Sequence, residues 1–279
     1  MTSRKSVVVF RREVWNYYKK NARNDLPWRK TTDPYKILVS EIMLQQTQVP
    51  RVIEKYRSFI KKFPTVEALA RSNLAQVLKE WNGLGYNRRA KYLHDAARVI
   101  VNEYVGNLKK ALEHPLSGVG PYTRAAVGTF AFNEPHAMIE TNIRSAIIHH
   151  FFPVSTKSKR GESLLEDAKV MRIAALASEG QDPRTWHWAL MDYGSHLKRT
   201  GVRNNDRSAH YVKQSKFEGS LRQFRGAILR ELHRGSTSLR TLISRLNPDE
   251  QGLPLLKKAL AGLERDGLIK KEKGKWRIA

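Results

Sequence analysis

The sequence contains no cysteine. This absence excludes disulfides, thiolate catalysis and metal ions held by cysteine. The chain also lacks any apolar run of the roughly 18 residues that a transmembrane helix needs, and the apolar stretch within MTSRKSVVVFRREVW is too short for a secretion signal. We therefore expect an intracellular protein of the cytoplasm, without a membrane partner.

Acidic residues are few. The 279 residues include 26 Asp and Glu against 51 Lys and Arg, which gives a formal net charge of +25. A charge of this size attracts polyanions at long range and makes their binding strongly salt dependent. Nucleic acid is therefore the expected partner, and we expect the protein to associate with the nucleoid. A basic protein of the membrane surface is the competing explanation. The length suffices for one large core and a small additional module.

Strand-like alternation is nearly absent before residue 267, whereas apolar residues return every three to four positions. This spacing predicts an all-α core. The expected helices cover residues 34–45, a segment opening at 50, 66–71, 74–81, 88–104, 109–114, 121–131, 142–151, 163–178 and 183–198. Residues 199–217 are polar, basic and weakly periodic, so we expect a linker or surface loop there.

The pattern changes after residue 217. Residues 221–232, 239–246 and 253–266 predict three helices, and residues 267–278 alternate as two strands around Lys273-Gly274. This is typical of a winged-helix module, so we expect two domains, 1–216 and 217–279. Its basic residues Lys257, Lys258, Arg265, Lys270, Lys271, Lys273 and Lys275 could lie on a nucleic-acid backbone. A winged helix that docks on a protein is the alternative.

The segment LSGVGPYT at residues 116–123 predicts a hairpin that enters a helix. Gly118 and Gly120 allow backbone conformations closed to other residues and a close approach to a ligand, and Pro121 suits the first turn of a helix. Free amide groups at a helix N-terminus favour a phosphate. An ordinary turn between two helices is the alternative reading of the glycine pair.

Two glutamates are candidate catalytic groups. Glu41 shares a helix face with apolar residues, so burial should favour its neutral form, which can serve as a general acid. Glu140 lies where a helix should begin, a place that stabilises an ionised carboxylate. Two carboxyl groups with opposite pKa shifts form a usable catalytic pair. Alternatively, an arginine neutralises Glu41 or the side chain faces outward, and Glu140 is merely a residue at a helix start.

Six segments carry a family resemblance: LPWRK at 26–30, DPYKILVSEIMLQQTQV at 33–49, FPTVEALA at 63–70, GLGYNRRAKYLHDAA at 83–97, LSGVGPYT at 116–123 and ETNIR at 140–144. Together they resemble the MutY adenine DNA glycosylases, members of the helix-hairpin-helix superfamily of base-excision repair enzymes. The match covers about residues 8–198, and LQQTQV joined to SEIM is specific to the MutY branch.

The resemblance implies a helix-hairpin-helix core of two helical subdomains, which removes an adenine paired with 8-oxoguanine or guanine after turning the nucleotide out of the duplex. It makes Glu41 the acid that protonates adenine N7 and helps to activate water. Residues matching the substrate and DNA contacts of the family are Trp28, Arg29, Gln45, Gln46, Thr47, Tyr86, Arg88, Gly118, Gly120 and Trp188. Among them, Gln45, Gln46 and Thr47 resemble the element that enters the duplex, and Tyr86 resembles the aromatic wedge beside the oxidised base.

Tyr122 occupies the position where lyase members of the superfamily carry a Schiff-base lysine. A phenol forms no imine, so the resemblance implies a monofunctional glycosylase. Tyr122 and Asn142 then support the positively charged sugar, and the hairpin backbone holds phosphates, with carbonyls that suit a monovalent cation. Alternatively, these residues have purely structural roles: Tyr122 is a packed aromatic, Asn142 is a helix cap, and Gln45 and Gln46 are surface amides.

Three features depart from the MutY pattern. Glu140 stands where most members carry aspartate, which moves the anion by about 1.5 Å unless the backbone retreats. The four cysteines of the iron-sulfur cluster are missing. The corresponding loop offers Lys198, Arg199, Arg203, Arg207, His210, Lys213 and Lys216 as phosphate-binding charges, and we expect no metal at His196 or His210. The winged-helix module replaces the larger C-terminal domain of the family, and Trp188 occupies a pocket region where a polar residue is expected.

Three functions remain open at this point. The leading hypothesis is a monomeric adenine glycosylase that acts on duplex DNA containing a mismatch or an oxidised guanine and needs no cofactor. A thymine glycosylase for T:G mismatches shares the hairpin tyrosine and a similar core. A DNA-lesion binder without catalysis is the third possibility.

Overall fold

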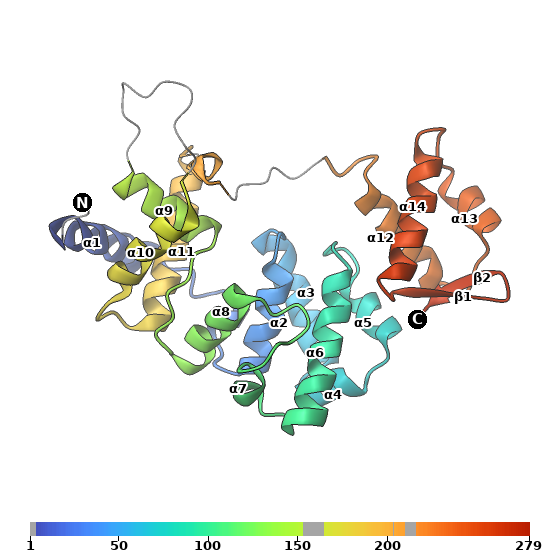
Figure 1. Ribbon diagram of the computed structural model, residues 1–279, viewed down its shortest axis with the longest axis horizontal. Coiled ribbons are helices and arrows are strands. Elements are labelled where there is room, and N and C mark those ends of the chain that lie inside the picture. The colour runs from blue at the N-terminus through green and yellow to red at the C-terminus, as the bar shows by residue number, and fades with distance from the viewer. Residues whose placement is uncertain (1–3, 153–164, 203, 210–215) are drawn as a thin grey trace. The chain divides into compact units, whose positions relative to one another are not determined.

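The computed structural model describes residues 4–152, 165–202, 204–209 and 216–279 (Figure 1). The described part consists of helices and a pair of short strands, and the chain divides into two compact units. The first unit comprises residues 1–37 and 120–213, and the second comprises 38–119 and 214–279. Each unit combines two separate stretches of chain, and the predicted domain boundary after residue 216 stays a prediction. None of the described helices has the length and apolarity needed to cross a membrane.

The first unit contains α1 (Arg4–Asn21), η1 (Pro27–Arg29), α8 (Pro121–Phe132), α9 (Thr141–Phe151), α10 (Asp167–Ser178), α11 (Pro183–Arg199) and η2 (Asn205–Arg207). The core of this unit forms where α1 and α9 pack against α11. Phe10 of α1 and Trp186 of α11 are fully buried there, with ring centroids 6.2 Å apart in an edge-to-face arrangement. The helix expected from residue 163 begins at Asp167, and residues 163 and 164 lie outside the described part.

Helix α1 has no counterpart among the helices expected from the sequence. Its buried residues Val7, Phe10, Val14 and Tyr18 recur at helical spacing and form one apolar stripe. The neighbouring Val8 and Val9 are exposed, so the run SVVVF does not display this period. Helix α1 therefore depends on packing against α10 and α11 more than on its local sequence.

Helix α2 (Pro34–Leu44) begins in the first unit and continues into the second, which also contains α3 (Val49–Lys62), α4 (Val66–Arg71), α5 (Leu74–Trp81), α6 (Arg88–Tyr104) and α7 (Leu108–Ala111). Side-chain caps start the short helices: Thr65 accepts from the Ala68 amide, and Asn73 forms a capping box with Gln76. Phe59 and Trp81 meet edge to face in the buried core of this unit. The helix expected over 109–114 is shorter and starts earlier, because Asn107 caps it.

The C-terminal module, residues 217–279, contains α12 (Leu221–His233), α13 (Leu239–Leu246), α14 (Gly252–Arg265), β1 (Ile269–Glu272) and β2 (Lys275–Ile278). The strands are antiparallel, with Ile269 opposite Ile278, and the turn residues Lys273 and Gly274 both have positive φ. Three helices and a hairpin thus follow the predicted order, while the winged-helix assignment stays a prediction. The seven basic residues singled out in this module are all exposed.

The basic loop expected over 199–217 is not uniformly a surface loop. Asn204 and Ser208 are buried, and the main chain of Leu165 pairs with that of residues 207–209. Arg207, expected to offer its charge to phosphates, donates from Nη1 to the Phe152 carbonyl at 2.7 Å. Arg203, His210 and Lys213, also expected on this loop, lie outside the described residues.

Candidate active site

Glu140 caps helix α9. Its Oε1 accepts hydrogen bonds from the amides of Asn142 at 2.8 Å and Ile143 at 2.9 Å. Its Oε2 accepts one hydrogen bond, from Asn142 Nδ2 at 3.1 Å. The expected helix start is therefore confirmed, and Asn142 is not the cap of the helix but a side-chain donor to that cap. The longer glutamate arm reaches the amides that an N-cap aspartate normally serves.

The pKa of Glu140 is raised, whereas a helix N-terminus was expected to stabilise the ionised carboxylate and lower the pKa. Desolvation raises the pKa of the carboxyl group, and the Asn142 and Ile143 donors together with the charge of Arg144 offset part of this rise. Arg144 itself is engaged elsewhere, with Nη2 2.6 Å from Asp167 Oδ2. Within the described residues, the hydrogen-bond donors to Glu140 are therefore neutral groups.

Gly194 of α11 allows the start of α9 to approach closely. A Cβ atom at this position would collide with the carbonyl group of Asn142 and would lie 2.9 Å from its Cα. Since this obstacle is backbone, no side-chain movement would relieve it. Sequence reasoning missed Gly194, although a glycine inside a helical pattern often marks such an approach.

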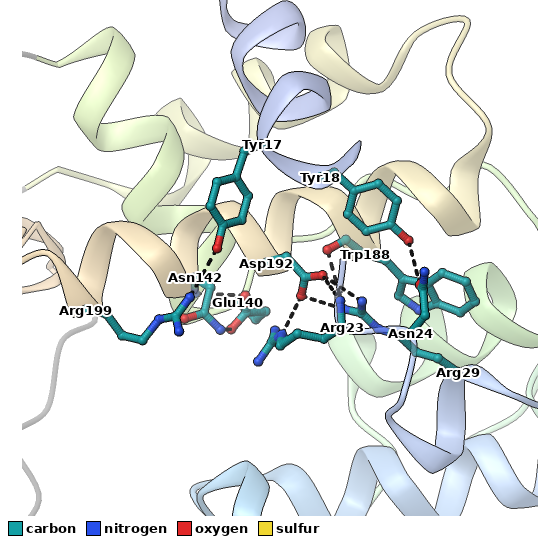
Figure 2. A network of polar contacts seen from close by, with 10 residues as sticks. All are labelled: Tyr17, Tyr18, Arg23, Asn24, Arg29, Glu140, Asn142, Trp188, Asp192 and Arg199. Atoms are coloured by element: carbon teal, nitrogen blue, oxygen red, sulfur yellow. Dashed lines mark hydrogen bonds and ion pairs between the residues drawn. The ribbon is translucent and has the colours of Figure 1, made fainter. Parts of the chain in front are cut away.

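Asp192 of α11 is a buried carboxylate, whereas Glu140 is partly buried, and Asp192 is paired with arginines (Figure 2). Arg29 contacts it with two nitrogens at 2.8 Å, and Arg23 Nε contacts Oδ1 at 2.6 Å. Desolvation acts to raise the pKa of Asp192, but the two guanidinium groups outweigh it and lower the pKa. This network was not predicted, because only the folded chain brings Arg23 and Arg29 to α11.

Trp188 lies beside the same network. The Arg29 guanidinium carbon is 5.3 Å from the Trp188 ring centroid, and Phe130 stacks on that ring with centroids 6.1 Å apart. Trp28, on η1, is buried. Arg29 was expected among the substrate and DNA contacts. Its side chain is 3% exposed and its charge is matched by Asp192, so it shapes this region as part of an ion pair.

The predicted hairpin forms, and its two glycines differ. Gly118 has φ +74°, and an added Cβ would lie 2.8 Å from Tyr92 Cβ, so this position requires glycine. Gly120 caps α8 with φ −77°, a conformation open to any residue, and its surroundings would accommodate a Cβ. The expectation that Gly120 adopts a glycine-only conformation is therefore wrong. Tyr122 is half-buried on the first turn of α8.

Glu41 of α2 is 7% exposed, as expected for the apolar face of its helix. The loop after α2 carries Gln45, Gln46 and Thr47. Gln46 is exposed with φ +56°, a conformation that costs free energy for a side chain of its size. This unusual backbone occurs within the segment that the resemblance assigns to duplex entry.

Arg89, which sequence reasoning missed, fastens that loop to the turn before α6. Its guanidinium donates to the carbonyls of Ile42, Met43, Gln45, Leu84 and Gly85 and to the Thr47 hydroxyl. Arg89 is 8% exposed, and desolvation lowers its pKa to about 10. Its spacing from Leu93, Ala96 and Ile100 places it on the buried face of α6, and this was the available signal.

Tyr86 stands at the end of this turn with φ +46°. Its ring centroid is 5.5 Å from the Arg89 guanidinium carbon and 5.4 Å from that of Arg222 on α12. Arg88 is half-exposed, with Nη2 2.9 Å from Asp266 Oδ1. The second unit thus brings Gln45, Thr47 and Tyr86 around one buried guanidinium. The pairing of Glu41 with Glu140 involves both units and stays a prediction.

The residues do not fit the metal cluster of the resembling family. The chain has no cysteine, and the described residues contain no group of three or more His, Asp or Glu side chains that could hold a metal ion. At the end of α11, His196 instead stacks on Tyr17 with ring centroids 4.5 Å apart, and Arg199 Nη2 donates to the Tyr17 hydroxyl at 3.1 Å.

Comparison with known proteins defines the class. Residues 39–174 match the model of the HhH-GPD superfamily base excision DNA repair proteins. This segment is therefore similar to that superfamily, in agreement with the helix-hairpin-helix class that the fold and the hairpin indicate. A thermostable thymine-DNA glycosylase shares this fold, with a TM-score of 0.59 and 28% identity over 74% of this chain and 97% of its own.

Within this class the chain is similar to adenine DNA glycosylases. The enzyme of that name from Mycolicibacterium smegmatis is 36% identical over 188 residues, which cover 66% of this chain and 61% of the relative. The one from Buchnera aphidicola is 35% identical over 162 residues, covering 57% of this chain and 46% of the relative. The resemblance to the MutY type is thus confirmed, although the chain spans less than two thirds of either relative.

Proposed function

We propose that the protein is a monofunctional DNA glycosylase that removes adenine paired with 8-oxoguanine or guanine by hydrolysing the N-glycosidic bond. The observation that carries this proposal is the Glu140 carboxylate at the start of α9, which is held by neutral donors only among the described residues. A carboxylate whose charge is not matched by a bound cation can stabilise a positive charge that develops on a sugar. The similarity to adenine DNA glycosylases supports the choice of base.

In the proposed mechanism, Glu41 acts as the general acid. Glu41 is buried on α2, and in this mechanism its carboxyl group donates a proton to N7 of the extruded adenine, which makes the adenine a better leaving group. The electron pair of the N-glycosidic bond leaves with adenine, and the sugar becomes an oxocarbenium ion. Glu140 Oε2 has one bound donor against two on Oε1, so Oε2 is the oxygen available to this cation.

Water completes the reaction by adding to the sugar carbon, and the proton it releases returns to Glu41. Tyr122, half-buried on α8, and Asn142, fixed on Glu140, flank the cationic sugar in this proposal. Because a phenol forms no imine, the DNA strand stays intact after the base is released.

Duplex DNA is the proposed partner. The net charge of +25 supplies long-range attraction, and the positive end of the α8 dipole, at Gly120 and Pro121, suits a phosphate. In the second unit, the segment Gln45–Thr47 and Tyr86 enter the duplex, and the hairpin carbonyls bind a monovalent cation that contacts the backbone. The proposal includes a monomer acting on chromosomal DNA.

Excision assays test this function. Duplexes containing A:8-oxoguanine, A:G or T:G are incubated with the protein and then heated in alkali, which breaks the strand wherever a base is missing. We expect breaks at the adenine of the first two duplexes. Glu41→Gln should lower the rate by about 10²–10⁴-fold, the usual contribution of a general acid, with duplex affinity largely unchanged. A Glu41→Gln variant that keeps its excision activity would contradict the role of Glu41 as the general acid.

Thymine excision from T:G is the second candidate. It is favoured by the extensive overlap with the thermostable thymine-DNA glycosylase and by Trp188, an apolar ring where a polar adenine contact was expected. Breaks only at the thymine of T:G would establish this alternative. Tight duplex binding without any break would instead support a lesion binder that lacks catalysis.

A further inference from the structure

The C-terminal module contacts the one aromatic side chain that the proposed function inserts into DNA. Arg222 on α12 donates from Nη1 to the Tyr86 hydroxyl at 3.0 Å, and its guanidinium carbon lies 5.4 Å from the Tyr86 ring centroid. Both residues belong to the second unit. A single arginine therefore makes a hydrogen bond and a cation–π contact to this tyrosine.

A second bridge joins the same module to the first turn of α6. Asp266, at the end of α14, is 2.9 Å from Arg88 Nη2 and 2.6 Å from Arg225 Nη2. Its side chain is 8% exposed, so water screens these contacts weakly. Asp266 thereby fixes Arg225, one turn after Arg222 on α12, against the start of α6. Arg222 consequently reaches Tyr86 from a helix that is itself anchored.

Tyr86 needs such support. Its φ of +46° is unfavourable for a tyrosine, and Gly83 and Gly85 before it also have positive φ. Strained backbone of this kind persists only where its surroundings hold it. Arg89 holds the turn through the Leu84 and Gly85 carbonyls, and Arg222 holds the tyrosine side chain itself.

We propose that Arg222 is a positioning residue for Tyr86, through which the C-terminal module determines which base is accepted opposite the excised adenine. This inference rests on the proposed function, in which Tyr86 stacks beside that base. Stacking energy depends on ring position, so a tyrosine held by an anchored guanidinium separates two similar purines better than a tyrosine with rotational freedom. Arg222 acts through Tyr86 and takes no part in bond cleavage.

The experiment compares two duplexes, A:8-oxoguanine and A:G, for four single variants of the full chain and for one double variant that combines Arg222→Met with Tyr86→Phe. Arg222→Met removes the guanidinium and keeps an apolar stem, Arg222→Lys keeps the charge, and Tyr86→Phe keeps the ring without its hydroxyl. Arg240→Met is the matched control, because Arg240 is an exposed arginine on α13 of the same module. For each variant we measure the affinity for both duplexes, the single-turnover excision rate and the thermal unfolding midpoint.

We expect Arg222→Met to reduce the preference for 8-oxoguanine over guanine about tenfold, the combined size of one cation–π contact and one hydrogen bond. Arg222→Lys should restore part of the preference, and Arg240→Met should retain the wild-type value. In the double variant with Tyr86→Phe, the losses should not add, because both changes remove one interaction. The unfolding midpoint should stay within a few degrees for Arg222→Lys, which separates positioning from folding.

Equal preferences for Arg222→Met and Arg240→Met would overturn the inference, and so would additive losses in the double variant. If the wild-type protein excises no base but binds the two duplexes with different affinities, the proposed function fails while the affinity ratios still test Arg222. If the wild-type protein binds both duplexes equally, Arg222 has no preference to set, and the inference is wrong.

Discussion

The start of α9 and the middle of α11 each hold a carboxylate within the first unit, and the two are treated in opposite ways. Asp192 is bound by two guanidinium groups, and its pKa is lowered despite desolvation. Glu140 is bound by two backbone amides and a side-chain amide, and desolvation raises its pKa. A bound cation distinguishes Asp192, which is buried, from Glu140, which is partly buried.

The difference in bound cations indicates a structural role for Asp192 and a catalytic role for Glu140. The negative charge of Asp192 is already neutralised by Arg23 and Arg29, so it has little effect on a further positive charge. The field of Glu140 is not neutralised in this way, and hydrogen bonds fix its orientation. A buried carboxylate is thus a catalytic candidate when neutral donors position it and no cation occupies it.

The largest expected effect is that of Glu140→Gln. The glutamine oxygen can still accept from the α9 amides, so the fold should be retained while the anion is lost. We expect single-turnover excision of adenine to fall by about 10²–10³-fold, the range for removing one electrostatic group from a preorganised site. A rate within threefold of the wild type would show that Glu140 serves only as a helix cap.

Asp192→Asn should affect stability instead. Removing the charge leaves the buried Arg29 guanidinium without its anion, which should cost about 3–5 kcal/mol of unfolding free energy, measured by urea denaturation. Where the variant remains folded, excision should stay within about tenfold of the wild type. Exposed Asp206→Asn is the matched control and should change stability little. A stable Asp192→Asn protein without activity would reverse the roles of the two carboxylates.

Glu140→Asp retracts the anion from its present position. The shorter arm can serve the same amides only if the backbone advances, so we expect the excision rate to change by about tenfold or more in either direction. The sign is informative: a faster variant means that the glutamate is poorly placed for the sugar, and a slower one means that the surroundings have adjusted to it. An unchanged rate would contradict a strict dependence on the anion's position.

The smallest effect concerns the pH dependence of stability. Asp192 has a lowered pKa in the folded state, so its contribution is present above its ordinary value of 3.8 and is lost as pH falls through the folded pKa. Glu140 has a raised pKa, so its contribution is present below 4.5 and is lost as pH rises through the folded value.

The same comparison is measurable by urea denaturation between pH 3 and pH 7. The stability deficit of Asp192→Asn relative to wild type should grow as pH rises. Any deficit of Glu140→Gln should shrink over the same interval, because wild type must ionise a desolvated group there and the glutamine variant does not. Parallel pH profiles for the two variants would contradict the assigned pKa directions.

Local sequence signals predicted much of the fold and part of the site. Pro121 marks the start of α8, Glu140 marks the start of α9, and the apolar neighbours of Glu41 predicted its burial. Each of these features is decided by residues within one or two helical turns. The resemblance to the MutY type then named the class that the comparisons confirm.

The features that sequence missed depend on residues far apart in the chain. Asp192 is paired because Arg23 and Arg29, more than 160 residues earlier, fold onto α11. Arg89 is buried because the end of α2 and the turn before α6 both direct carbonyls toward it. Helix α1 was missed for a local reason, since Val8 and Val9 obscure the period of the residues that pack.

Because residue 194 is a glycine, the start of α9 and the middle of α11 are in direct backbone contact. No side chain separates the two backbones at this point, so we expect α9 and α11 to move together as one rigid body. A displacement of α11 should therefore shift the Glu140 carboxylate, which caps α9, by a similar distance. Substitutions elsewhere on α11 should thus alter the position of the Glu140 carboxylate through Gly194, a residue without a functional group.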